Sequence, residues 1–233
     1  MRRIIAAFLA ALALSATVPA RAGDNLVVVE LFSSQGCAAC PPADELLNLL
    51  AERDDVLPLA LHVDYWDYIG WKDIFAHPRN TERQKAYARM AGHRMIYTPQ
   101  MIVGGKAEIV GYKPMMLAEQ ILEQREEDPP VKLQLVRSGG RVHVTGTSDR
   151  VFDPPAWVQL VRYIPRQEVK ITRGENAGKT ILYSNIVTDW KTLQEWDGRE
   201  PLSLIAEAKG DQPVAVIVQE AGPGPVLGAA RLR

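Results

Sequence analysis

The sequence is poor in cysteine, in runs of like charge and in long apolar stretches. Only two cysteines occur in 233 residues, so the only possible intramolecular disulfide joins Cys37 to Cys40. Closing so short a loop removes little chain entropy, which makes chemistry a better reason for the pair than stabilisation. The formal net charge of -1, without a run of like charges, argues against nucleic acid or an anionic membrane surface as a partner.

The first 22 residues have the pattern of a secretory signal peptide. Arg2 and Arg3 precede an apolar run over 4–14, and Ala20 and Ala22 occupy the two positions that a signal peptidase reads. The apolar run is shorter than the ~20 residues that span a bilayer. We therefore predict cleavage after Ala22, a periplasmic or secreted location, and no membrane anchor after cleavage.

The cysteines lie between a predicted strand and a predicted helix. Residues 26–32 are almost continuously apolar, which is typical of a strand buried on both faces. Pro41 and Pro42 fit the first turn of a helix, whose N–H groups have no intrahelical partner. The positive end of a helix stabilises a thiolate, and in Cys-X-X-Cys sites the first thiol has a pKa of roughly 3.5 to 7.5. Cys37 is therefore the predicted nucleophile, and Cys40 the thiol that resolves a mixed disulfide.

The pattern of the chain changes at Asp128, Pro129 and Pro130, which form a stiff break. Before it, residues 23–128 predict an α/β domain of order β-α-β-α-β-β-α. After it, short alternating runs separated by turns predict an all-β sandwich-like domain over 129–233. The turn at 174–179 is rich in glycine but lacks the spacing of a phosphate-binding loop. The predicted strands of the second domain cover 132–137, 141–147, 157–164, 168–173, 180–187, 202–207 and 214–219.

Six segments carry a resemblance to a known family. The chain resembles the exported thioredoxin-like family catalogued as domain of unknown function 1223 in ELFSSQGCAACPPADELL, HVDYWDYIGWKDIFA, NTERQKAYA, YTPQMIVGG, TRGENAGKT and GPGPVLGAA. The resemblance implies a thioredoxin-like domain with an appended β domain, and it implies no substrate. It also implies that Thr98-Pro99 has the cis bond of thioredoxins, faces Cys37 and pairs with the substrate chain. Gln35-Gly36 stands where thioredoxins have a tryptophan.

Three further residues are candidates for proton transfer. Glu30 interrupts the buried strand, where a carboxylate is costly unless it is paired or protonated. It either shuttles a proton for the resolving thiol or forms a hydrogen bond at the sheet edge. His62 and Asp64 begin an aromatic-rich segment and, with Trp66, are expected to line a cleft beside Cys37. The alternative is that the aromatic side chains only pack over the sheet edge. The basic residues of the next helix are expected on a solvated face: Arg83, Lys85 and Arg89.

Together these features predict an exported thiol–disulfide oxidoreductase. Cys37 and Cys40 would form its redox-active disulfide without a further cofactor. Its substrates would be protein or small-molecule thiols and disulfides, and a redox partner would recycle the pair. The alternative is a non-enzymatic thioredoxin-like binding protein in which Cys37, Cys40 and His62 bind copper(I), which thiolates and imidazole suit, or another metal. Structural zinc is disfavoured because it needs two more ligands.

Overall fold

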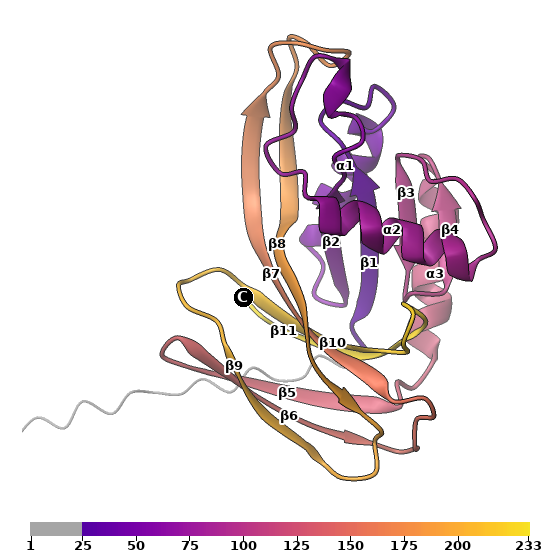
Figure 1. Ribbon diagram of the computed structural model, residues 1–233, viewed down its shortest axis with the longest axis vertical. Coiled ribbons are helices and arrows are strands. Elements are labelled where there is room, and N and C mark those ends of the chain that lie inside the picture. Colours follow the sequence, from indigo (N-terminus) through magenta and orange to yellow (C-terminus); the bar gives the residue numbers. More distant parts are fainter. Residues whose placement is uncertain (1–24) are drawn as a thin grey trace, which may run out of the picture.

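The structure is a computed structural model that describes residues 25–233 (Figure 1). The predicted signal peptide lies outside these residues. Among the helices of the described part, none is long and apolar enough to cross a membrane.

The first half of the chain has the predicted order of elements. The strand β1 is buried along its whole length because helices cover both faces of its sheet. Alternate residues of β1 pack against α1 and α3 on one face and against α2 on the other. The turn between β3 and β4 is made by Gly104 and Gly105, whose φ angles of 56° and 69° suit glycine. The elements are β1 (Val27–Ser33), α1 (Pro41–Ala51), β2 (Val56–His62), the 3₁₀ helix η1 (Asp67–Ile69), α2 (Pro78–Met90), β3 (Gln100–Val103), β4 (Ala107–Val110) and α3 (Pro114–Glu126).

The second half consists of strands, two of which are much longer than predicted. The strand β7 includes the predicted run 157–164 and residues 168–170 of the run 168–173, so the separation of these runs was wrong. Pro165 is tolerated inside β7 because β10 pairs only with residues 157–162, which leaves the following stretch at an open edge. The strand β11 was not predicted. The elements are β5 (Val131–Ser138), β6 (Arg141–Ser148), β7 (Ala156–Lys170), β8 (Thr180–Trp196), β9 (Leu202–Glu207), β10 (Val214–Gln219) and β11 (Val226–Leu232).

One mixed sheet runs through both halves of the chain. Its eight strands have the order β11-β10-β7-β8-β2-β1-β3-β4, and β8 joins β2 in parallel through the pair Ala60 and Ile186. A second sheet, β5-β6-β9, packs on the β7 and β10 part of the large sheet around a shared apolar core. The division at residue 128 stays a prediction. Strand pairing nevertheless joins the two sides, and Figure 1 shows β7 and β8 as long strands beside β2.

Candidate functional site

The site is centred on a disulfide between Cys37 and Cys40 at the start of α1. Cys40 is the N-cap residue of α1 and already has helical backbone angles, and Pro41 and Pro42 follow in the first turn as predicted. Proline has no N–H group, so the first turn of α1 offers few free N–H donors. It would stabilise a thiolate at Cys37 mainly through the helix dipole. Both cysteines are buried, with 2% of Cys37 and 0% of Cys40 exposed.

The loop before Cys37 is held by hydrogen bonds with two distant segments of the chain. The backbone N–H of Gln35 donates to Oδ2 of Asp73 at 2.8 Å, and the indole N–H of Trp71 donates to Oε1 of Gln35 at 2.8 Å. The amide of Asn176 donates to the carbonyl oxygens of Gln35 and Cys37, both at 2.9 Å. Asn176 is 1% exposed and lies in the connection between β7 and β8. The second half of the chain therefore contacts the cysteine loop directly.

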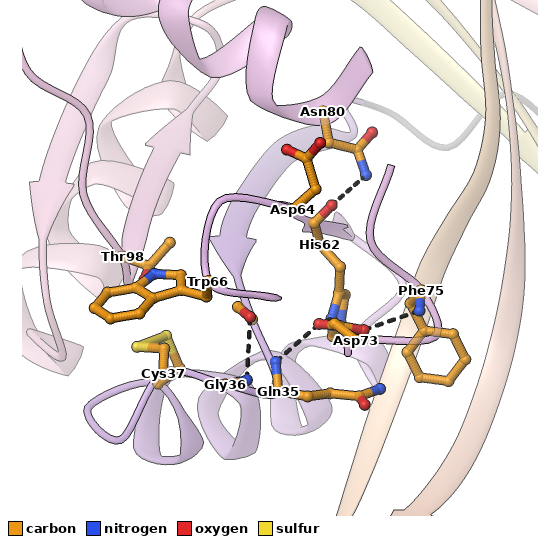
Figure 2. A network of polar contacts seen from close by, with 12 residues as sticks. Gln35, Gly36, Cys37, His62, Asp64, Trp66, Asp73, Phe75, Asn80 and Thr98 are labelled. Carbon is orange, nitrogen blue, oxygen red and sulfur yellow. Dashed lines mark hydrogen bonds and ion pairs between the residues drawn. A yellow bond between two sulfur atoms is a disulfide. The ribbon is translucent and has the colours of Figure 1, made fainter. Parts of the chain in front are cut away.

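The Thr98-Pro99 peptide bond is cis, as the resemblance implied. The indole N–H of Trp66 donates to Oγ1 of Thr98 at 2.7 Å. Figure 2 shows the Trp66 ring beside Thr98 and the disulfide. A Cβ at Gly36 would lie 3.3 Å from the Cβ of Trp66, so this tryptophan packs closely on the residue before Cys37. An aromatic side chain thus adjoins the cysteines although it comes from the loop after β2.

His62 and Asp73 form a buried pair behind the loop, with Nδ1 of His62 2.7 Å from Oδ2 of Asp73. Burial alone would raise the pKa of Asp73, but the charge of His62 and the N–H groups of His62, Gln35 and Phe75 lower it. Burial would lower the pKa of His62, but Asp73 and Asp44 raise it. Asp73 was not among the predicted site residues. Its position in the aromatic-rich segment was the only signal in the sequence.

Asp64 lies close to α2. Its carboxylate accepts a hydrogen bond from the hydroxyl of Thr81 at 2.5 Å. In Figure 2 it lies on the side of Asn80, away from Cys37. The structure therefore does not bring Asp64 to the disulfide, and its role in proton transfer stays a prediction.

The copper(I) alternative requires three ligands at one point. Within residues 25–233, no three His, Cys, Asp or Glu side chains form a group that could hold a metal ion. Cys37, Cys40 and His62 are therefore not grouped as metal ligands in this disulfide form, and the copper(I) alternative stays a prediction. His62 instead uses Nδ1 for Asp73.

Glu30 is paired on the face of β1 that packs against α2, opposite to α1. Its carboxylate accepts from the guanidinium of Arg83 at 2.5 and 2.8 Å and from the hydroxyl of Tyr87 at 2.6 Å. Arg83 lies over the ring of Trp190, with 3.8 Å between its Cζ and the ring centroid. The expectation that Arg83 is solvated was wrong, because its side chain is only 12% exposed and neutralises Glu30.

The described residues form a mixed sheet with three α-helices and a small three-stranded antiparallel sheet, and a Cys-X-X-Cys disulfide follows β1. These features are consistent with a thioredoxin-like protein. The chain belongs to the family described as protein of unknown function (DUF1223), whose model matches residues 28–219. The predicted family is therefore confirmed. No curated protein matches the sequence significantly.

Solved structures include one clear relative. A protein of Agrobacterium tumefaciens, determined by X-ray crystallography, is 32% identical, with a TM-score of 0.77 over 91% of this chain and 96% of that chain. An endonuclease/exonuclease/phosphatase of Beutenbergia cavernae is 11% identical, with a TM-score of 0.24 over 46% of this chain and 24% of that chain. The second likeness is too weak to carry an argument.

Proposed function

We propose that this protein is an exported thiol–disulfide oxidoreductase. The observation that carries the proposal is the position of its only two cysteines. They form a disulfide at the start of α1, beside the cis bond of Thr98-Pro99 and the ring of Trp66. A four-residue ring adds little stability, so a reversible disulfide is the use that best fits this placement.

The reaction proceeds by thiol–disulfide exchange. In the reduced protein, the thiolate of Cys37 attacks one sulfur of a substrate disulfide and displaces the other as a thiolate, which takes a proton from solvent. Cys40 then attacks the sulfur of Cys37, and the second substrate thiol leaves. The substrate is reduced to two thiols and the protein is oxidised to its disulfide. The reverse sequence oxidises two substrate thiols.

We assign substrate positioning to Thr98, Pro99 and Trp66. Thr98 directly precedes the strand β3 and shares a hydrogen bond with Trp66. An extended substrate segment placed along Thr98 would bring its sulfur to Cys37, which is the geometry of β-strand addition. Cys37 is only 2% exposed in the disulfide form, so a substrate sulfur reaches it only when the side chains that cover it move aside.

The proposed location is the periplasm or the exterior of the cell, where disulfides persist. The signal-peptide pattern of residues 1–22 supports it. The proposed substrates are protein or small-molecule thiols and disulfides, and a separate redox partner would recycle the pair.

Trapping of mixed disulfides tests the proposal with the mature chain, residues 23–233. C40S should accumulate a mixed disulfide on Cys37 with a disulfide-bonded peptide, because the resolving thiol is missing. C37S should accumulate none, and the wild-type pair should cycle between dithiol and disulfide with dithiothreitol and an oxidant. Absence of trapping in C40S, or a native disulfide that dithiothreitol does not reduce, contradicts the proposal. Stoichiometric copper(I) on the reduced protein, lost in C40S, would support the metal-binding alternative instead.

A further inference from the structure

A cluster of buried polar atoms lies between α1 and the strands β1, β2 and β8. In the described part of the chain, four of its side chains are at most 2% exposed and have atoms without a hydrogen-bond partner. Ser33 and His62 are register partners on β1 and β2, and the rings of His62 and Tyr183 lie 4.9 Å apart. Buried polar groups are nearly always hydrogen-bonded, so such a cluster needs an explanation. The unpartnered atoms are Oγ of Ser33, both carboxylate oxygens of Asp44, Nε2 of His62 and the hydroxyl of Tyr183.

Asp44 lies one helical turn after Cys40, the more buried cysteine. Its N–H donates to the carbonyl of Cys40 at 3.1 Å, and Cys40 already has helical backbone angles. Residues four apart on a helix share a face, with Cβ atoms ~5–6 Å apart, and their side chains lean toward the N-terminus. The carboxyl group of Asp44 therefore leans toward Cys40 inside the protein.

The surroundings of Asp44 leave its proton mobile at neutral pH. Burial raises the pKa of Asp44 to about 7. The charge of His62 and the nearby hydroxyl of Ser33 lower this pKa, whereas the charges of Asp73 and Glu45 raise it. Tyr183 faces the same carboxylates from β8, and its own pKa is raised by burial first and then by Asp44 and Asp73. A group that titrates near the working pH both accepts and donates protons efficiently.

Glu30, the carboxylate that the sequence suggested for proton transfer, has a different environment. Both of its oxygens are bound by Arg83, and one also accepts from Tyr87. It lies on the face of β1 opposite to α1, since Val28 and Phe32 share its face and pack with Tyr87. Asp44 has neither a cation bound to its oxygens nor a hydrogen-bond donor.

We propose that Asp44 accepts and donates the proton of Cys40. This inference rests on the proposed function. When Cys37 carries a substrate as a mixed disulfide, the carboxylate of Asp44 takes the proton from the Cys40 thiol. The Cys40 thiolate then attacks the sulfur of Cys37, and the substrate leaves as a thiolate that is protonated by solvent. In the reverse direction a substrate thiolate attacks Cys37, and the released Cys40 thiolate takes its proton from the carboxylic acid of Asp44.

The two thiol steps can be timed separately with the reduced mature protein and an aromatic disulfide that releases a coloured thiolate. The first release reports the attack of Cys37, and the second reports the attack of Cys40 on the mixed disulfide. D44N should slow the second release by a factor of about 10² to 10⁴ at pH 7 and abolish its inflection near that pH. E52Q is the matched control, because Glu52 is an exposed carboxylate at the C-terminal end of the same helix, about two turns after Asp44, and it should leave both releases unchanged.

A second measurement checks the titration of Asp44 independently of thiol chemistry. Between the unfolded pKa of 3.8 and about 7, the folded carboxyl holds a proton that the unfolded one has lost. The free energy of unfolding of the wild type should therefore fall as the pH rises through this range. D44N should lack this part of the pH dependence. D44A serves both experiments if D44N does not fold.

The outcomes separate the two proposals. Failure of the wild-type protein to release the first thiolate contradicts the oxidoreductase function and, with it, the role of Asp44. A normal first release with an unchanged second release in D44N and D44A overturns the role of Asp44 alone. An unfolding free energy whose pH dependence is the same in wild type and D44N also contradicts it.

Discussion

Asn176 links the second half of the chain to the cysteine loop, and its removal should loosen that loop. N176A deletes two buried hydrogen bonds of 2.9 Å, to the carbonyls of Gln35 and Cys37, besides a less buried one that the side-chain oxygen of Asn176 accepts from Lys179. Each such bond contributes a net ~0.5–1.5 kcal/mol, so the expected loss of stability is about 1–3 kcal/mol. At about 2–4 °C per kcal/mol for a chain of this size, the Tm should fall by about 2–12 °C. The loop should also expose the disulfide more often.

The matched control is N48A. Asn48 on α1 donates to the carbonyl of Leu182 on β8 at 2.9 Å, so its removal weakens the contact between helix and strand without touching the cysteine loop. Thermal unfolding by circular dichroism gives the Tm of each oxidised variant, and the rate of reduction by dithiothreitol gives the accessibility of the disulfide. We expect both variants to lose stability and only N176A to be reduced faster. Equal reduction rates in wild type, N48A and N176A would refute the reasoning that Asn176 holds this loop.

Three further predictions concern the buried charges and the packing of the loop. E30A should lower the free energy of unfolding in urea by about 3–5 kcal/mol, because it leaves Arg83 buried and without its carboxylate partner. E30L combined with R83M should lower it less, and a double variant no more stable than E30A would contradict this. The pKa of Asp73 is lowered in the folded state, so its contribution to stability is present above the unfolded value of 3.8 and is lost as the pH falls through the folded value. D73N should therefore show a smaller acid-induced loss of unfolding free energy than the wild type, and an unchanged loss would mean that the pair with His62 does not lower this pKa. G36A should lose about 1–3 kcal/mol in the same urea assay, because the new methyl group would meet neighbouring side chains at 3.3 Å, and an unchanged stability would show that these neighbours yield freely.

Local patterns in the sequence were sufficient for the elements around the cysteines. The apolar run of β1, the prolines of the first turn of α1 and the order of elements through α3 follow from composition and periodicity within short windows. The family and the cis bond at Thr98-Pro99 came from resemblance, because a Thr-Pro pair by itself favours trans. Strand lengths in the second half were less predictable. Pro165 signals a break in a local window, although the open edge of β7 accommodates it.

The sequence by itself determined the candidate residues for the proposed chemistry, namely Cys37 and Cys40 between a strand and a helix. Only the tertiary structure decided what surrounds them. Asn176 reaches Cys37 across 139 positions of the chain, and the pairing of β8 with β2 closes the polar cluster around Asp44. Whether a carboxylate meets an arginine, as Glu30 does, or stays unpartnered depends on contacts between distant segments. Such contacts leave no periodic trace in the sequence, since periodicity reports only which face of an element is buried.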